Sequence, residues 1–568
     1  MPLTWTFRET GDPPGDLDRW AERLSVSPLL ARLLWQRGQH TPEDMQVFLS
    51  PGLKHLTALE EVPGLSQGAE ILSQGLQQGK RLAVWGDYDV DGVTATAVVK
   101  DCLAGHGLEV MHHLPNRLEE GYGLNTAGVE ALAEAGADML LTVDCGIADT
   151  AAVARALELG MTVVVSDHHL PGPELPEAHA LVNPRLGDCP CPDLAGVGVA
   201  FLLMAGVNRL LPAPPEPMDM RRLLDLVALG TLADVVGLRG QNRILVKNGM
   251  LLLAEARRPG IAALKEACGF DMAAPLGTGQ VTFGLAPRIN AAGRLGDAQL
   301  ALDCLLAPDL SAARPLARKL DAMNADRRRT EMEIQEQAME QARAQLDRLG
   351  LVCFEPHWHS GVIGIVASRL VETFYRPTLI LTEEDGLLKG SGRSTAEFDL
   401  FKGLTDCKDL LTRFGGHRQA AGLALAPADL DALRQRFHEA VAEQTGPEPL
   451  TATLRLDGEL PLADIDFTLL KELELLQPFG PGNAEPKFAS APLLVRGVRH
   501  FGSDRSHAKL TLMDEATGVT MDAKAWRMAS QLPAELAGQR IRIAFSPRVD
   551  TYGGVPSIDL QLKDWQPA

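Results

Sequence analysis

The sequence predicts an α/β protein: a parallel-sheet domain and a second α/β domain joined by a long helix, followed by a C-terminal β-barrel. Three observations support this fold class. Strand-like runs alternate with helical patterns of roughly 10–15 residues from residue 81 onwards. A charged stretch at 308–349 contains almost no glycine, and short β-type runs recur after residue 450. Alternating strands and helices of these lengths are typical of a parallel sheet that is covered by helices on both faces.

The elements of the first half are expected in this order. Residues 1–75 have the pattern of short helices interrupted by Pro and Gly. Four strands of the parallel sheet follow, at 81–85, 108–115, 137–146 and 161–169. The helix expected at 125–136 begins after Asn125, whose side chain can cap it. Helical patterns then dominate to about residue 258.

The second half of the chain contains two further units. Because the stretch 308–349 is rich in Ala, Arg, Glu and Gln, we expect one long connecting helix there. A second α/β unit runs from 351 to about 445, and the sequence GPEP at 446–449 has the composition of a linker. The β-type runs that follow include little helix, which favours a small barrel, with an OB-fold as the leading candidate.

Charge and cysteine content limit the possible partners and the compartment. The formal net charge is −20, which by itself argues against a partner with a phosphate backbone. The charge is uneven, however, because residues 487–563 contain 11 Lys and Arg but 7 Asp and Glu. Only Cys189 and Cys191 of the eight cysteines are close in sequence, so free thiols in a reducing cytosol are favoured over a structural zinc site. No secretory signal or long apolar stretch is visible, and we expect a cytoplasmic protein.

The clearest chemical motif is GDYDVDG at 86–92, which follows the first strand and precedes a helix. Asp87, Asp89 and Asp91 repel one another unless cations or water screen them. Hard divalent cations prefer oxygen ligands, so the motif predicts a Mg²⁺ or Mn²⁺ site. The same spacing can open a calcium loop, although a helix begins here where that loop would continue. An acidic surface turn is the remaining alternative.

Two more strand ends carry residues that bind metals. Asp144 ends the third strand, and Asp167, His168 and His169 end the fourth. In an open parallel sheet, ligand sites lie beyond the carboxyl ends of the strands, so we expect these side chains near the aspartate motif. Asp234, at the end of a helical run, is a weaker candidate. Aspartates with one or two histidines suit a pair of Mn²⁺ or Mg²⁺ ions, and a phosphodiester is the substrate that needs such a pair.

Two common classes of α/β enzyme are disfavoured. No G-x-G-x-x-G motif follows the first strand, as a Rossmann dehydrogenase requires. No G-x-x-x-x-G-K-[ST] motif is present, as a P-loop nucleotide hydrolase requires.

The motifs together resemble those of a known superfamily. GDYDVDG, TVDCG, SDHH and LGTLADVV have the order and spacing seen in DHH phosphoesterases, and GGHRQAAG at 415–422 resembles the motif of the DHHA1 substrate domain. Phe414 stands before GGH where the wider superfamily usually has Gly, which is similar to RecJ-type exonucleases. Other segments also resemble RecJ, so the resemblance covers about residues 45–565: LPNRLEEGYGLN, APRINAAGRLG, HWHSGVIGIVASRL, KGSGRS and QPFGPGNAEPKF.

The resemblance implies a role for each matching residue. Metal ligation is implied for Asp89, Asp91, Asp144, His168 and Asp234. Asp87 is implied to ligate metal or to orient a ligand, and His169 to stabilise the scissile phosphate or act as an acid. Contacts to substrate are implied for Arg117, Tyr122, Arg288, Ser391, Arg393 and His417. An arginine suits a 5′ phosphate because it donates two charge-assisted hydrogen bonds, and Tyr122 is expected to stack on a base; a surface ion pair and a packing role are the alternatives.

The resemblance also implies a domain division and a function. The first three expected segments are an N-terminal helical extension at 1–75, a DHH catalytic domain at 76–260 and a helical connector at 261–350. A DHHA1 substrate-binding domain at 351–446 and an OB-fold nucleic-acid-binding domain at 450–568 follow. The expected activity is single-stranded-DNA-specific 5′→3′ exonuclease activity that releases 5′ mononucleotides with two Mn²⁺ or Mg²⁺ ions, in DNA repair and recombination. The expected protein partner is a single-strand-binding protein or a helicase, and no association with a membrane is expected. The rivals are a small-molecule or oligonucleotide DHH phosphodiesterase, which usually lacks the connector and the OB-fold, and a non-catalytic DNA-binding scaffold, which would have lost metal ligands.

Overall fold

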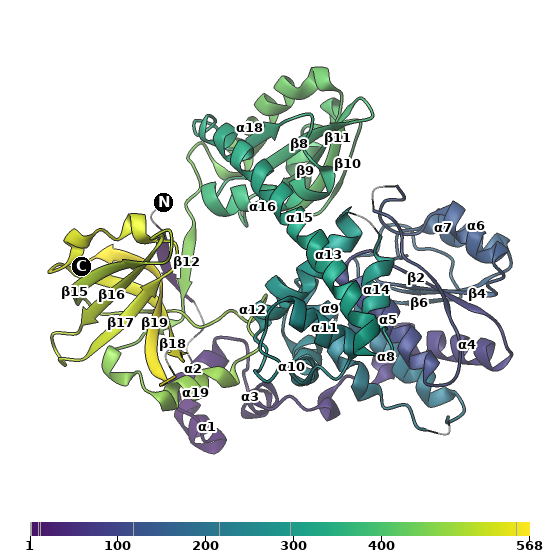
Figure 1. The fold of residues 1–568 in the computed structure, drawn as a ribbon, viewed down its shortest axis with the longest axis horizontal. Helices are drawn as coiled ribbons and strands as arrows, with labels where there is room; N and C mark the ends of the chain where they lie inside the picture. Colours follow the sequence, from purple (N-terminus) through teal and green to yellow (C-terminus); the bar gives the residue numbers. More distant parts are fainter. Residues whose placement is uncertain are drawn as a thin grey trace. The chain divides into compact units, whose positions relative to one another are not determined.

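The computed structural model describes residues 3–8, 11, 13–117, 119–214, 216–295, 297–551 and 554–568. The chain forms two compact units, each shown in Figure 1. Unit 1 comprises Met1–Thr57, Val235–Asn248 and Thr453–Ala568, and unit 2 comprises Ala58–Asp234 and Gly249–Ala452. The predicted fold class is confirmed, because the structure has a parallel sheet, a mixed sheet, a long helix and a C-terminal barrel. The residue bounds given above for the five segments stay a prediction.

The first sheet of unit 2 is parallel throughout, with the strand order β3-β2-β4-β5-β6. Its strands are β2 (Leu82–Gly86), β3 (Met111–His113), β4 (Met139–Val143), β5 (Thr162–Ser166) and β6 (Ala180–Val182). The central strands are continuous apolar runs that are buried on both faces, as parallel sheets require. Strand order reverses between β2 and β4, and ligands bind beyond the carboxyl ends of strands at such a point.

Helices cover both faces of this sheet (Figure 1). On one face, Trp85 and Val165 of the strands form a core with residues of α6 (Thr126–Glu134) and α7 (Thr150–Glu158). On the other face lie α4 (Leu65–Gln77), α5 (Val90–Ala104) and α8 (Gly196–Leu210), and α9 (Leu224–Ala233) packs against α5 and α8. Helix α5 is buried along most of its length, which explains why its own residues are small or apolar on nearly every side of the helix.

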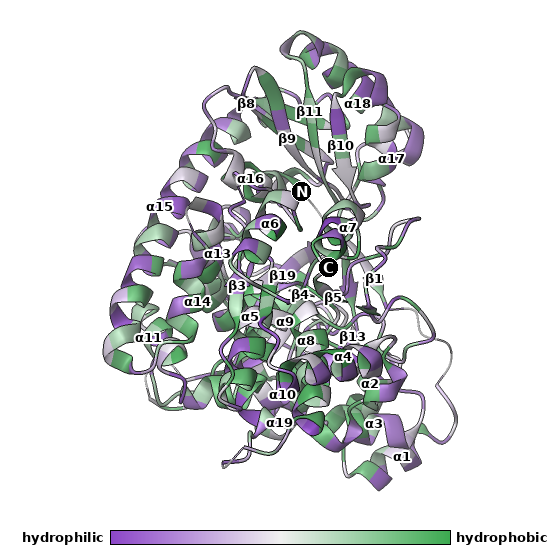
Figure 2. Cartoon of the chain, turned by 90° about the vertical axis from the view of Figure 1, so that its right-hand side faces the viewer, coloured by the Kyte–Doolittle hydropathy of each residue, from purple (hydrophilic) through white to green (hydrophobic). Residues whose placement is uncertain are grey.

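One long helix, α15 (Leu310–Arg343), lies where the charged, glycine-poor stretch predicts it. It begins after Asp309, whose side chain accepts a hydrogen bond from the Ala312 amide. Its first half packs against α11 (Pro259–Ala267), α13 (Ala286–Leu295) and α14 (Gln299–Leu305), and its second half against α16 (Ser360–Phe374). Figure 2 shows hydrophilic and hydrophobic residues interspersed along α15, as expected for a helix that packs along one stripe.

The second sheet of unit 2 is mixed, with the order β10-β11-β9-β8-β7. Its strands are β7 (Leu351–Phe354), β8 (Thr378–Glu384), β9 (Leu387–Arg393), β10 (Arg413–Gly416) and β11 (Ala420–Leu425). One face packs against α16 and the C-terminal part of α15. The other packs against α17 (Leu400–Thr405) and α18 (Leu430–Thr445).

The C-terminal part of unit 1 is a closed five-stranded barrel. Its strands are β15 (Leu493–Phe501), β16 (His507–Met513), β17 (Thr520–Ala525), β18 (Arg540–Asp550) and β19 (Ser557–Pro567). The barrel closes because β18 pairs with both β15 and β19. Alternate residues point inward, so that Leu510, Leu512 and Phe545 fill a single core.

The N-terminal residues of unit 1 complete this barrel domain. Helices α1 (Leu17–Leu24), α2 (Pro28–Trp35) and α3 (Pro42–Leu49) share a core with α19 (Phe467–Leu475) and the barrel. Strand β1 (Thr4–Phe7) pairs in parallel with β12 (Thr453–Leu456). The sequence pattern predicts the helices and misses β1, because a four-residue strand is specified by a partner near the other end of the chain.

A buried arginine of α10 (Gly240–Glu255) joins this helix to the C-terminal ends of α3 and α19. Arg243 is 2% exposed, and its guanidinium donates to the carbonyl oxygens of Phe48, Leu476 and Gln477 at 2.9–3.0 Å. The guanidinium also lies 3.7 Å from the centroid of the Phe48 ring. Burial lowers the pKa of Arg243 to about 9, since its partners are neutral.

We predict that Arg243→Met destabilises unit 1, because it leaves several buried carbonyl groups without donors. Hydrogen bonds to charged groups contribute roughly 1.5–3 kcal/mol each, so the free energy of unfolding should fall by about 3 kcal/mol. Urea unfolding followed by circular dichroism measures this change. The exposed Arg499 provides the matched control, since Arg499→Met should change the free energy by less than about 0.5 kcal/mol. Equal effects of the two substitutions would contradict the prediction.

Candidate metal centre

Three neighbouring strands of the parallel sheet end at the same level. Gly86 of β2 pairs with Val143 of β4, and Val143 pairs with Ser166 of β5. The next residues along the chain are Asp87, Asp144 and Asp167, which therefore leave the sheet at one edge. This edge is where the sequence pattern predicts a metal site.

The carboxylates and imidazoles at this edge converge as three groups, in each of which the ligand atoms all lie within 4.8 Å of one another. The groups are Asp87, Asp89 and Asp144; Asp91, His168 and Asp234; and Asp144, His168 and His169. His168 is central, because its Nε2 atom lies 3.1 Å from Asp144, 3.7 Å from Asp234 and 3.9 Å from Asp91. The structure thus brings together all seven residues for which the sequence predicts metal binding or catalysis.

Backbone amides hold the two aspartates at the start of α5. Asp89 is the N-cap of this helix and accepts hydrogen bonds from the amides of Asp91 and Gly92, at 2.8 and 3.1 Å. The Asp91 carboxylate accepts from the amides of Gly196 and Val197, the first residues of α8, at 2.8 and 2.9 Å. The positive end of the α8 dipole therefore faces the Asp91 carboxylate.

Glycines leave the space that these carboxylates occupy. A Cβ atom on Gly196 would lie 2.4 Å from Asp144 Oδ1, and one on Gly230 would lie 2.9 Å from Asp91 Oδ1. A Cβ atom on Gly92 would lie 2.4 Å from the Asp87 amide nitrogen. The close approach of backbone to carboxylate is possible only because these positions lack side chains.

Asp144 itself has a left-handed backbone conformation, with φ of 63°. Its amide donates to the Ser166 carbonyl, which fixes the turn that follows β4. Asp is one of the few residue types that adopts this conformation at moderate cost.

Asp167, the first residue of the DHH run, positions its neighbours. Its Oδ1 atom accepts from the amide of His168 at 2.7 Å and from Nδ1 of His169 at 2.8 Å, and its Oδ2 atom accepts from the Ile147 amide. Tyr122 also reaches His169, with its hydroxyl 3.1 Å from Nδ1. The sequence pattern gives no sign of either contact, since both depend on how the loops fold over the strand ends.

Burial and mutual repulsion disfavour ionised carboxylates at this site. Burial and the neighbouring Asp89 raise the pKa of Asp91 to about 7. Burial, Asp91 and Asp89 raise the pKa of Asp234 to about 9, and burial with the same neighbours raises the pKa of Asp144 well above its ordinary value. Burial and His169 lower the pKa of His168 to about 4, which leaves its imidazole neutral and able to ligate.

The donor set fits divalent cations. Three buried carboxylate oxygens of the site accept no hydrogen bond within the described chain, namely Asp87 Oδ1, Asp144 Oδ1 and Asp234 Oδ2. Buried polar atoms are normally paired, so their grouping at one place indicates a missing positive partner. Oxygen ligands with imidazole suit Mn²⁺ or Mg²⁺.

A cluster of arginines lies beside the acidic loop. The Arg117 guanidinium lies 5.3 Å from the centroid of the Tyr88 ring, and Arg393 donates to Ser391 Oγ at 3.0 Å. Arg294 of α13, which sequence reasoning missed, donates to the Gly361 carbonyl at 3.0 Å. Burial, together with the nearby guanidinium groups of Arg117 and Arg393, lowers the pKa of Arg294 to about 10. Clustered cations of this kind are stabilised by an anion.

Two predicted substrate residues lie in other surroundings. Arg288 is buried, and its guanidinium bonds to the Gly284 carbonyl and to Asp321, both at 2.8 Å. His417 is exposed at the turn between β10 and β11, where its amide donates to the Ala420 carbonyl. His417 is not a member of the three metal-binding groups among the described residues.

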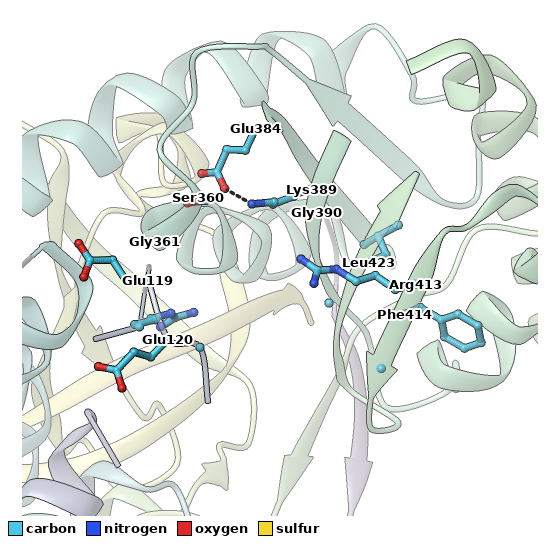
Figure 3. Close-up of a pocket in the computed structure, with 14 residues that line it drawn as sticks. Glu119, Glu120, Ser360, Gly361, Glu384, Lys389, Gly390, Arg413, Phe414 and Leu423 are labelled. Atoms are coloured by element: carbon cyan, nitrogen blue, oxygen red, sulfur yellow. Dashed lines mark hydrogen bonds and ion pairs between the residues drawn. The ribbon is translucent and has the colours of Figure 1, made fainter. Parts of the chain in front are cut away.

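A pocket of about 660 Å³ extends from Arg117 to the mixed sheet (Figure 3). Arg413 points into it, and Lys389 at its edge pairs with Glu384 at 2.9 Å. Phe414 points the opposite way, toward Phe401. Gly415 and Gly422 form part of the lining, and a Cβ atom on Gly415 would meet no heavy atom within 4 Å. The pocket is therefore polar, with an open glycine floor.

Comparisons with known proteins agree with this geometry. Models of three domain families match the chain: the DHH family N-terminal domain at 81–231, the DHHA1 domain at 348–443 and the RecJ OB domain at 456–564. The single-stranded-DNA-specific exonuclease RecJ of Dickeya dadantii is 38% identical over 566 residues, which cover 96% of this chain and 96% of that protein. The chain belongs to the RecJ family of single-stranded-DNA-specific exonucleases. The RecJ exonuclease of Escherichia coli is 35% identical over 98% of both chains.

Solved RecJ structures share the whole fold. RecJ of Thermus thermophilus in complex with Mn²⁺ has a TM-score of 0.85 and 33% identity, and the match covers 100% of this chain and 80% of that one. The Mg²⁺ complex of the same protein has a TM-score of 0.79. In the described part of this RecJ-family chain, no helix has the length and apolarity needed to cross a membrane.

We predict that Gly92→Ala weakens cation binding, because its Cβ atom would collide with the backbone of Asp87. Displaced groups next to metal ligands typically cost about 10–100-fold in metal affinity. Calorimetric titration with Mn²⁺ measures this change. Gly172→Ala is the matched control, since a Cβ atom there would contact only the Glu174 carbonyl, at 3.8 Å. Wild-type affinity in Gly92→Ala would show that the loop tolerates the side chain.

We also predict a pH dependence of the cation-free protein. The pKa of Asp234, raised to about 9, means that the folded state holds a proton that the unfolded state has released at neutral pH. The contribution of Asp234 to the free energy of unfolding is fully present below the ordinary pKa of an aspartate. This contribution is lost as the pH rises through about 9. In EDTA, the Tm of the wild type should fall relative to that of Asp234→Asn between pH 7 and pH 10. Parallel melting curves for the two proteins over this range would contradict the assignment.

Proposed function

We propose that this chain degrades single-stranded DNA from its 5′ end and releases 5′ mononucleotides, using two divalent cations. The observation that carries the proposal is the pair of separate ligand groups, Asp87, Asp89 and Asp144 on one side and Asp91, His168 and Asp234 on the other. Two separate groups of three ligands suit two cations, as phosphodiester hydrolysis requires. Asp89, Asp91, Asp144, His168 and Asp234 would ligate, with Asp87 ligating or orienting a ligand.

The bound cations would polarise a phosphoryl oxygen and lower the pKa of the attacking water. His169 is the protein group suited to the leaving oxygen. Burial lowers the pKa of His169, but its hydrogen bond to Asp167 and the nearby carboxylates raise it overall. Because Nδ1 donates to Asp167, the protonated ring presents Nε2 to the substrate. His169 would then stabilise the scissile phosphate or donate a proton to the 3′ oxygen.

The arginine cluster supports the polarity of the reaction. Arg117, whose charge acts on the Asp87 carboxylate, would form an anion-binding group with Arg294, Arg393 and Ser391. Planar guanidinium groups bind a terminal phosphate with paired hydrogen bonds. A terminal 5′ phosphate held there would place the first phosphodiester bond near the ligands. His417 and Arg288 are proposed to contribute farther along the strand, and Tyr122, whose ring is half exposed, to contact a base.

The wider setting of the reaction is also a proposal. Single-stranded DNA arises in DNA repair and recombination, and the barrel of unit 1 is proposed to bind the strand as OB-folds do. A single-strand-binding protein or a helicase would supply such substrates. The relatives are named for activity on single-stranded DNA.

Blocked oligonucleotides test the polarity. With Mn²⁺, the purified protein should degrade a single strand carrying phosphorothioate linkages at its 3′ end and should spare one carrying them at its 5′ end. Chromatography of the products should show 5′ mononucleotides, and a duplex of the same sequence should remain intact. The reverse preference would reject the proposed polarity.

A matched pair of variants ties this activity to the metal centre. Asp144→Asn keeps a residue that tolerates the left-handed backbone but removes a charged ligand, and cleavage should fall by about 100-fold or more. Asp138→Asn, at the other end of β4, should retain wild-type activity. Full activity of Asp144→Asn would remove Asp144 from the ligand set.

A further inference from the structure

Cys189 and Cys191 form a close pair outside the metal-binding residues. They lie in the loop between β6 and α8, and their sulfur atoms are 3.3 Å apart. Cys189 is partly exposed and Cys191 is buried, while the surrounding Asp188 and Pro190 are exposed. Solvent therefore reaches one thiol of a pair that is already in contact.

The other cysteines are poorly suited to oxidation. Burial raises the pKa of Cys102, Cys304, Cys353 and Cys407 to about 12 and that of Cys268 to about 11. Burial also raises the pKa of Cys145 well above its ordinary value. Because the thiolate is the reactive form, a reagent in solution should react first at Cys189.

The loop that carries the pair is fastened to the metal centre at both ends. At its start, Asn183 Nδ2 donates to the His169 carbonyl at 3.0 Å, and Arg185 Nε donates to the His168 carbonyl at 2.8 Å. At its end, the first amides of α8 hold the Asp91 carboxylate, as described above. A change in the middle of the loop therefore acts on residues that surround the metal centre.

We infer that Cys189 and Cys191 are a modification site, at which a low-molecular-weight disulfide such as glutathione disulfide converts the two thiols into a disulfide within the loop. The geometry permits the bond, since Cα atoms two residues apart are at most roughly 7 Å apart and disulfides span roughly 4.4–6.8 Å. The coupling to cation binding rests on the proposed metal function.

The reaction proceeds by two exchanges. The Cys189 thiolate attacks one sulfur of the oxidant, whose S–S bond breaks and releases one thiolate. The Cys191 thiol, after losing its proton to water, attacks the Cys189 sulfur of the mixed disulfide and releases the second thiolate. The protein loses two electrons and two protons, and the oxidant is reduced to two thiols.

The disulfide should weaken cation binding. Bond formation brings the sulfur atoms from 3.3 Å to about 2.05 Å, which draws the loop together between its two attachments. Groups that orient metal ligands typically affect metal affinity by about 10–100-fold, so oxidation should lower Mn²⁺ affinity by about 10-fold.

The 568-residue chain is treated with glutathione disulfide, digested under conditions that prevent thiol–disulfide exchange, and analysed by mass spectrometry. Its Mn²⁺ affinity is measured by calorimetry. The expected result is a peptide containing both cysteines that is two hydrogens lighter, with Mn²⁺ affinity about 10-fold weaker and restored by dithiothreitol. Cys189→Ser should keep its affinity under oxidation, whereas the control Cys268→Ser should behave like the wild type.

Two outcomes overturn the inference. One is that no disulfide forms between the two cysteines, either because glutathione stays attached to Cys189 or because neither cysteine is modified. The other is a complete disulfide with unchanged Mn²⁺ affinity. Neither outcome bears on the exonuclease assay, so a failure here leaves the proposed function standing.

Discussion

Burial of like charges at one edge of a sheet is the constraint on which the rest of unit 2 depends. Asp87, Asp91 and Asp144 are each less than 5% exposed, and Asp234 faces them from the end of α9. Ionised carboxylates in such surroundings repel one another strongly because little water screens them. The folded chain tolerates them through protons, backbone amides or bound cations, and cations suit the buried carboxylate oxygens that accept no hydrogen bond within the described chain.

The fold supplies the other conditions for this arrangement. Parallel strands in register deliver three aspartates to one edge, and the reversal of strand order beside β2 leaves room there. The start of α8 supplies two amides to Asp91. Gly196 and Gly230 keep backbone close to carboxylate, so the centre is built from main chain as much as from side chains.

Much of this architecture follows from short-range sequence patterns. Apolar runs alternating with helices predict the parallel sheet, and the rule for strand ends predicts that Asp89, Asp144 and His168 meet. Asp234 is less evident in the sequence, because only the packing of α9 brings its carboxylate 3.7 Å from His168. Arg294 and the Tyr122–His169 contact are invisible locally, since each is made by segments far apart in the chain. Arg288 and Arg294 occupy the same motif, and only the fold distinguishes an arginine paired with Asp321 from one beside Arg117.

The make-up of unit 1 has a consequence for how the protein is produced. Its first residues, including β1 and the apolar faces of α1–α3, are completed by residues that begin at Thr453. At roughly 5–20 residues per second, a ribosome needs about 20–90 s to reach that point after the N-terminal strand has been made. During this interval Leu30, Leu33 and Leu34 lack the surface that later buries them. A nascent chain of this kind is expected to engage chaperones early, and chains truncated before the barrel should aggregate through their N-terminal helices.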